Sequence, residues 1–350
     1  MTRPTLTRLS ARRIAGSARM AIGARVAIGA LILAAVLPSE ASAQPRSADP
    51  AVRGIPRSAF PRLVPLAPGV YGYEEIRAPG FTTVSLVVVG DSGVLIADGQ
   101  GSPAATQRLL DEIRTVTARP VRWYVVGSDH GDHTAGNSVL PPGVTWIVHP
   151  NSQRQLQQDA VAADAANART GSSAAGATPS PPRLVVVPPQ AMTGDREQVD
   201  VGGRVVEVRF LGRAHTGGDL MVHLPGEKLL FMSEAYLNRV FPAMRSAYPA
   251  EWVTVLDRAL AMDVTRFVPG HGFIETPRVS REELVAFREA LRAVIAEVTR
   301  LHARGLSADA AVREADWGSY RDWFLAEQQG PIAVRRVYQA LDGSLPRDTR

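Results

Sequence analysis

Cysteine is absent from this 350-residue chain, and so are long apolar runs. Without cysteine the chain has no disulfide bridges, thiolate metal ligands or cysteine nucleophile. The apolar run 26–37 has twelve residues, whereas a membrane-spanning helix needs roughly 20. No repeat with a period of about 20–50 residues is visible. We therefore expect no repeat architecture, and no stable membrane span once the N-terminal leader is removed.

An excess of positive charge is present only at the N-terminus. The formal net charge is +5, but residues 1–43 contain six arginines and a single acidic residue, Glu40. The rest of the chain holds 33 basic and 33 acidic residues. A phosphate-binding surface requires clustered positive charge, which this balance does not support. We therefore expect no nucleic-acid partner.

Residues 1–43 have the pattern of a signal peptide. Arginines come first, the apolar run 26–37 follows, and Ala41-Ser42-Ala43 forms an A-x-A cleavage site before Gln44. We expect cleavage after Ala43 and a periplasmic or secreted mature protein. Two interpretations of the leader stay open: Arg12-Arg13 is a twin-arginine signal, or Met20 is the true start of a compact signal. We favour the second.

Composition and periodicity divide the remaining chain into one α+β domain with flexible additions. Residues 44–66, rich in Pro, Arg and Ser, are predicted to form a flexible tail. The domain covers 67–342, with a low-complexity mobile insertion at 169–182 and C-terminal helices within 281–342. The expected strands are 69–76, 82–89, 93–97, 121–126, 144–149, 184–187, 197–210 with a turn at Gly202-Gly203, 219–224, 228–231 and 266–268. The expected helices are 104–116, 152–168, 250–262, 281–304, 308–315, 321–327 and 332–341.

Four of the seven histidines follow predicted strands in glycine-containing turns. They are His130, His133, His215 and His271. Ligands on short loops at strand ends suit an open catalytic metal site, because the sheet fixes their geometry while one face stays accessible. Imidazole and carboxylate donors without thiolate suit zinc, and also manganese or iron. We expect the other three histidines to be non-catalytic: His149, His223 and His302.

Four sequence motifs occur in the order found in the metallo-β-lactamase superfamily. The segment 127–137 (GSDHGDHTAGN) resembles its signature H-x-H-x-D-H followed by x-x-G-N. The segment 212–219 (GRAHTGGD) is similar to its G-x-x-H-T-x-G-D turn, and 268–272 contains P-G-H-G. The segment 93–98 resembles the strand G-x-x-x-x-D that precedes the first helix of that fold. The resemblance covers about residues 70–275.

This resemblance implies a four-layer αββα sandwich with metal ions in a cleft at one edge of the two sheets. His130 and His215 would hold the first metal, and Asp132, His133 and His271 the second. One or two zinc ions per chain would activate hydroxide for attack on an ester, amide or lactam of a small-molecule substrate. Asp132 would also orient the attacking water.

The chain departs from the family pattern at two positions. Ser128 replaces the first histidine of the signature, and a serine hydroxyl is a poor zinc ligand. Glu234 lies where many members have a metal-bridging Asp, so bridging by its longer side chain is plausible. We expect Asp98 to be structural and Asp219 to support a ligand or close a turn. A loop after Glu234 either lines the substrate pocket or is an ordinary surface loop; it contains Arg239, Phe241, Arg245 and Tyr248.

Three functions remain open on the sequence. The first is an exported zinc-dependent hydrolase with one or two metal ions. The second is a mononuclear enzyme that uses Asp132, His133 and His271 and leaves the first site vacant. The third is a non-catalytic binding protein on a decayed fold. Nothing in the sequence indicates an oligomeric state.

Overall fold

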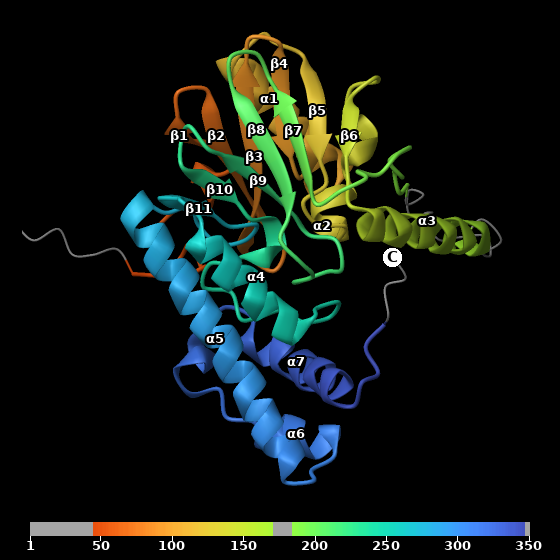
Figure 1. Cartoon of the computed structure of the whole chain (residues 1–350), viewed down its shortest axis with the longest axis vertical. Helices are drawn as coiled ribbons and strands as arrows, with labels where there is room; N and C mark the ends of the chain where they lie inside the picture. The colour runs from red at the N-terminus through yellow and green to blue at the C-terminus, as the bar shows by residue number, and fades with distance from the viewer. Residues whose placement is uncertain (1–44, 171–183, 347–350) are drawn as a thin grey trace, which may run out of the picture. The chain divides into compact units, whose positions relative to one another are not determined.

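The computed structural model describes residues 45–170 and 184–346 (Figure 1). The predicted signal peptide 1–43 and most of the predicted insertion 169–182 lie outside these residues. Arg169 and Thr170 belong to helix α3 (Pro150–Thr170). Within the described ranges, no helix has both the length and the apolar character needed to cross a membrane.

The first sheet contains six strands in the order β1-β2-β3-β4-β5-β6. The strands β1 to β4 pair antiparallel, whereas β4, β5 and β6 run parallel to one another. A parallel pair needs a crossover connection, and helix α1 (Pro103–Val116) provides it between β4 and β5. The bounds are β1 Arg62–Ala67, β2 Val70–Arg77, β3 Phe81–Gly90, β4 Gly93–Ala97, β5 Val121–Val125 and β6 Thr145–Ile147.

The second sheet contains five strands in the order β11-β10-β9-β8-β7. Its pairs are antiparallel except β10 with β11, which helix α4 (Pro249–Ala261) connects. Gly202 and Gly203 turn the chain between β7 and β8 with φ of +92° and +77°, values that glycine adopts without strain. The bounds are β7 Arg196–Asp200, β8 Val205–Phe210, β9 Leu220–Leu224, β10 Leu229–Phe231 and β11 Arg266–Val268.

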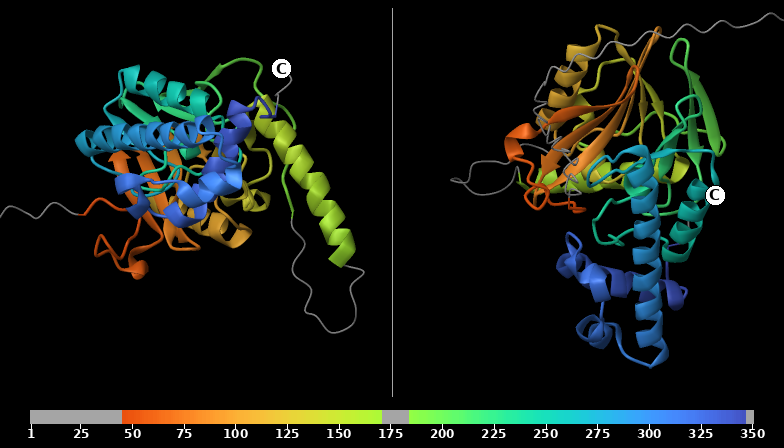
Figure 2. Two further views of the ribbon diagram at one scale, coloured as in Figure 1. Left: turned by 90° about the horizontal axis from the view of Figure 1, so that it is seen from below. Right: turned by 90° about the vertical axis from the view of Figure 1, so that its left-hand side faces the viewer.

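Apolar side chains on both faces of each sheet produce four layers. Leu95 of β4 faces the second sheet and shares a buried cluster with Val222. The next residue, Ile96, points the other way and packs with Leu109 of α1. On the outer face of the second sheet, Leu230 joins a cluster with α4 and α5 (Pro277–Ala303). The predicted αββα sandwich is therefore confirmed, with α1 on one side and α4 and α5 on the other (Figure 2).

The predicted flexible tail over 44–66 was wrong. Ala48 is fully buried in the cluster that includes α5, and Arg53 pairs with Glu275 at 2.5 Å. The strand β1 begins at Arg62 and pairs with β2. Composition alone missed this segment because its arginines are held by specific partners far away in the sequence.

Two other local predictions were also wrong. Residues 184–187 form no strand, although Val185 and Val187 pack against the cluster around α1. Their apolar pattern reflects this packing and not ladder hydrogen bonds. The expected helix 321–327 is replaced by a 3-10 segment, Gly318–Asp322, whereas the expected helix 332–341 is confirmed as the C-terminal part of α7 (Ala326–Leu341). Pro331 lies inside α7, where packing of Val334 and Val337 offsets the lost hydrogen bond. The remaining C-terminal helix is α6 (Ala308–Glu314).

Candidate metal centre

The histidine-bearing loops meet because they leave their strands in the same direction. The strands β4 and β5 are parallel, and β8 runs parallel to β10 and β11 across the antiparallel β9. Their carboxyl ends therefore point to one edge. A hydrogen bond from Leu220 N to Gly127 O joins the loops of the two sheets there. Gly127 is required at this junction, because a Cβ would lie 2.8 Å from Asp98 Oδ1.

The structure brings the predicted ligands together in two groups. One group contains Asp132, His133, Glu234 and His271, and the other contains His130, His215 and Glu234. The potential ligand atoms within each group lie within 4.8 Å of one another. This division agrees with the two sets that the motif resemblance implies. It adds Glu234 to both sets.

The imidazole of His271 presents its Nε2 to the first of these groups. Nδ1 of His271 lies 2.9 Å from the carbonyl oxygen of Thr82, so Nδ1 carries the proton and donates to it. Nε2 is therefore left with a lone pair. It lies 3.0 Å from Asp132 Oδ2, 3.2 Å from Glu234 Oε1 and 3.2 Å from His133 Nε2.

His133 lies beside the carboxylate of Asp98. Nδ1 of His133 lies 3.1 Å from Asp98 Oδ2, which leaves Nε2 facing His271. Asp98 Oδ1 accepts a hydrogen bond from Gly127 N at 2.7 Å, and Asp98 belongs to neither group of potential ligands. Both observations fit the structural role predicted for Asp98. The two Nε2 atoms lie 3.2 Å apart beside the carboxylates of Asp132 and Glu234, so a proton or a cation must lie between them. The donor set of this group therefore fits a metal ion.

Glu234 connects the two groups through its two carboxylate oxygens. It lies in a short 3-10 turn, Ser233–Ala235, directly after β10. Its Oε2 lies 2.8 Å from His130 Nδ1 and 3.2 Å from His215 Nδ1. Its Oε1 lies 3.2 Å from His271 Nε2. This is the arrangement expected of a bridging carboxylate.

Ser128 contacts Glu234 through its hydroxyl group. Its Oγ donates a hydrogen bond to Glu234 Oε2 at 2.6 Å. The serine is fully buried, and its small side chain leaves room for the carboxylate. With Glu234, the group of His130 and His215 reaches three donors without the histidine that the motif lacks.

The electrostatics of the centre favour bound positive charge. Burial by itself would raise the pKa of Glu234, but His215, His130 and His133 outweigh it and hold that pKa well below its usual range. Burial lowers the pKa of His130, yet the Glu234 carboxylate raises it to about 9. Burial also lowers the pKa of His271, but Asp132 and Glu234 outweigh it and raise that pKa to about 9. Carboxylates that attract protons to imidazole attract a divalent cation equally well.

Comparisons with known proteins agree on the architecture. No family model matches the chain. A curated relative, the 2,4-dinitroanisole O-demethylase subunit alpha of Nocardioides sp. (strain JS1661), is 24% identical over 204 residues, 58% of this chain. The chain spans about half of that relative, 55% of its length.

Solved structures cover more of the chain. The sec-alkylsulfatase Pisa1 from Pseudomonas sp. superposes with a TM-score of 0.63 at 17% identity, over 79% of this chain and 49% of that one. The metallo-β-lactamase from Pontibacter korlensis gives a TM-score of 0.52 at 18% identity, over 65% of this chain and 98% of that one. The chain has the metallo-β-lactamase fold. The expectation drawn from the four motifs is thereby confirmed for the fold.

On this metallo-β-lactamase fold, sequence reasoning missed three contacts of the centre. Arg77 at the end of β2 pairs with Asp132 Oδ2 at 2.7 Å. Ser246 Oγ lies 3.2 Å from His130 Nε2, and the carbonyl of Thr82 orients His271. None of these carries a local signal, since each partner is more than 50 residues away in sequence.

The remaining candidates lie around the centre or away from it. Thr216 donates to both oxygens of Asp219 at 2.7 Å, so Asp219 closes the turn that carries His215. In the loop after Glu234, Phe241 and Tyr248 are buried, Arg239 pairs with Glu283 and Arg245 is exposed. The histidines expected to be non-catalytic lie outside both groups: His149, His223 and His302.

Proposed function

We propose that this chain is a hydrolase that holds two zinc ions and shares Glu234 between them. The observation that carries the proposal is the placement of the Glu234 oxygens, with Oε2 toward His130 and His215 and Oε1 toward His271. A carboxylate between two imidazole groups is a suitable bridge for a paired site. Imidazole and carboxylate donors suit zinc.

When bound, paired zinc ions polarise a scissile bond and lower the pKa of water to about 7. The residues of the chain supply the rest. Asp132 is the ligand candidate nearest solvent in its group, with 14% of its side chain exposed against 0% for His133. Its carboxylate is suited to accept a hydrogen bond from a water molecule and orient it. Arg77 pairs with Asp132 and holds that carboxylate in place. Burial and Glu234 raise the pKa of Asp132, but His271 and His133 outweigh them and lower it.

The substrate class is proposed from the chemistry of this centre: a small molecule with an ester, amide or lactam bond. The comparison proteins are named as an alkylsulfatase, an O-demethylase and a metallo-β-lactamase. Because these names span several bond types, the fold does not select among them. The A-x-A site before Gln44 supports an exported enzyme, and an intact mass beginning at Gln44 after secretion from a bacterial host would support that placement.

The decisive experiment combines metal analysis with a substrate panel. The panel contains activated esters, a chromogenic lactam, alkyl sulfates and an aryl methyl ether. We expect turnover of at least one class, lost after chelation and restored by zinc, and absent in Asp132→Asn. One zinc per chain with full turnover would favour the mononuclear enzyme. Two zinc ions without turnover of any member would favour a non-catalytic binding protein.

A further inference from the structure

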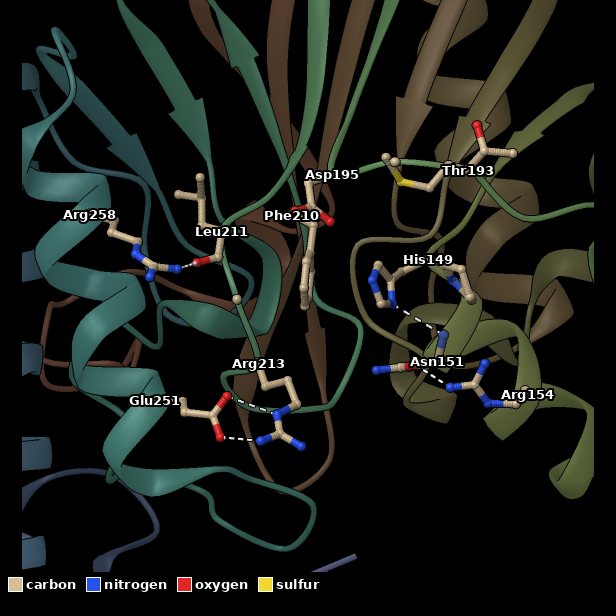
Figure 3. A pocket seen from close by; sticks show the side chains of 14 residues that line it. His149, Asn151, Arg154, Thr193, Asp195, Phe210, Leu211, Arg213, Glu251 and Arg258 are labelled. Atoms are coloured by element: carbon tan, nitrogen blue, oxygen red, sulfur yellow. Dashed lines mark hydrogen bonds and ion pairs between the residues drawn. The ribbon is translucent and has the colours of Figure 1, made fainter. Parts of the chain in front are cut away.

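A cavity lies beside the turn that carries His215, and none of the metal-ligand candidates lines it. Its volume is about 840 Å³, within the range of small-molecule sites. It is bounded by the start of α3, the segments around β7 and β8, and α4 (Figure 3). Its charged lining residues are Arg154, Asp195, Arg213, Glu251 and Arg258, and its aromatic ones are His149 and Phe210.

Two arginines of this cavity have no carboxylate partner among the described residues. Arg154 donates to the side-chain oxygen of Asn151, and Arg258 donates to the carbonyl oxygen of Leu211 at 2.6 Å. Both acceptors are neutral. Arg213 differs, because Glu251 accepts from its guanidinium in a two-pronged ion pair. Neither of these two guanidinium groups is in an ion pair within the described part of the chain, although the Asp195 carboxylate also lines the cavity, so three arginines of the lining face two acidic residues.

The start of α3 adds to this positive potential. The helix begins at Pro150 and has no acidic residue in its first turn, while Arg154 lies one turn further on. Helix N-termini carry partial positive charge, so an arginine there is unfavourable and an anion is favourable. This end of α3 is also fixed to the metal-bearing turn, since Asn151 Nδ2 donates to Gly217 O at 2.7 Å.

An aromatic surface lies between the two arginines. The rings of His149 and Phe210 stack with centroids 4.0 Å apart and an interplanar angle of 26°. Figure 3 shows Arg258 and Arg154 on opposite sides of the cavity, with Phe210 and His149 between them. A ligand that fits has a flat apolar body against Phe210 and an acid group on either side.

We propose that this cavity binds a small organic dianion, with sulfonate, carboxylate or phosphate groups held by Arg154 and Arg258. The site is separate from the metal centre, so binding requires neither metal nor turnover. If the chain proves not to be a hydrolase, the proposal for this cavity is unaffected. If the cavity binds no anion, the proposed hydrolase activity is unaffected.

The test uses 2,6-naphthalenedisulfonate as the probe and isothermal titration calorimetry on the full chain, after chelation and after zinc loading. We expect saturable binding in both states, weakened about tenfold by Arg154→Gln and by Arg258→Gln, because each loses a charge-assisted contact. The monoanion 2-naphthalenesulfonate should bind correspondingly more weakly. Thermal melts of every variant establish that each protein is folded.

Two matched variants make the test decisive. Arg122→Gln removes an exposed arginine of β5 outside the cavity and should leave binding unchanged. Arg77→Gln removes the arginine beside Asp132 at the metal centre and should also leave it unchanged. Loss of binding in Arg77→Gln with retention in both cavity variants would place the probe at the metal centre and overturn the proposal. Equal binding by all variants, or no binding by the wild type, would overturn it as well.

Discussion

Ser128 Oγ donates a hydrogen bond to Oε2 of Glu234 over 2.6 Å, between residues 106 positions apart. The serine stands where the family pattern has a metal-ligating histidine. Its hydroxyl instead holds a carboxylate that faces both histidine groups. The two departures from the family pattern, Ser128 and Glu234, are therefore one feature: the small residue makes room for the long one and orients it.

This pairing changes the expected result of restoring the missing histidine. If Ser128 marked a vacancy, Ser128→His would raise bound zinc from one to two equivalents. Because Glu234 already supplies the third donor, we expect Ser128→His to add no zinc and to crowd the carboxylate. Ser128→Ala removes one hydrogen bond to a ligand and should weaken zinc binding about tenfold. Titration of the metal-free wild type and variants with zinc distinguishes these cases. If Ser128→His binds one more equivalent of zinc than the wild type, Ser128 marks a vacant ligand position.

Removing a ligand of the other group should release its metal. Asp132→Ala and His271→Ala each delete one of two side chains whose donor atoms lie 3.0 Å apart. We expect about one zinc fewer per chain and loss of turnover in each. His302→Ala, a change at a half-buried histidine near the end of α5 and outside both groups, is the matched control and should retain full metal. Unchanged metal content in both site variants would show that these residues are not ligands.

Asp98 should matter for stability as well as for the metal. It is fully buried, accepts from Gly127 N and Ser233 Oγ, and lies beside His133. Asp98→Ala leaves these buried donors without an acceptor, at a cost of about 2–4 kcal/mol in the free energy of unfolding. Urea denaturation of metal-free protein measures this. A loss below about 0.5 kcal/mol would show that Asp98 does not hold the loop.

Glu207 should make stability depend on acid pH. Burial opposes the shift, but His223, Arg209 and Arg196 lower the pKa of Glu207 to about 2, from an ordinary 4.5. Because the folded-state pKa is the lower one, ionised Glu207 stabilises the fold above pH 4.5. That contribution is lost as the pH falls from 4.5 toward 2. Glu207→Gln should cost about 1 kcal/mol or less at pH 7, and the difference should shrink across this window in thermal melts. A difference that stays constant would exclude the ionic contribution.

The four histidines of the candidate centre could be predicted because each sits in a short motif at a strand end. Their distribution into two groups also followed from the motifs. Arg77, Ser246 and the carbonyl of Thr82 could not be found in this way. They reach the centre through contacts between distant segments, and a backbone carbonyl has no sequence signature at all.

The same physical limit explains the errors in the fold. Ala48 and Arg53 belong to a segment with the composition of a tail, yet specific contacts with distant residues fix it. Val185 and Val187 have the composition of a strand, yet they contribute packing without strand pairing. Strands β2 to β5 were predictable because burial gives each a continuous or alternating apolar pattern.

The shared use of Glu234 is the central claim, and zinc stoichiometry tests it most directly. The measurement is native mass spectrometry of zinc-loaded wild type beside Glu234→Gln, which keeps the shape of the side chain but removes its charge. We predict two zinc ions per chain in the wild type and loss of at least one in the variant, since both groups lose their common carboxylate. A wild type with a single zinc ion, or a Glu234→Gln variant that keeps two with unchanged affinity, would contradict the account.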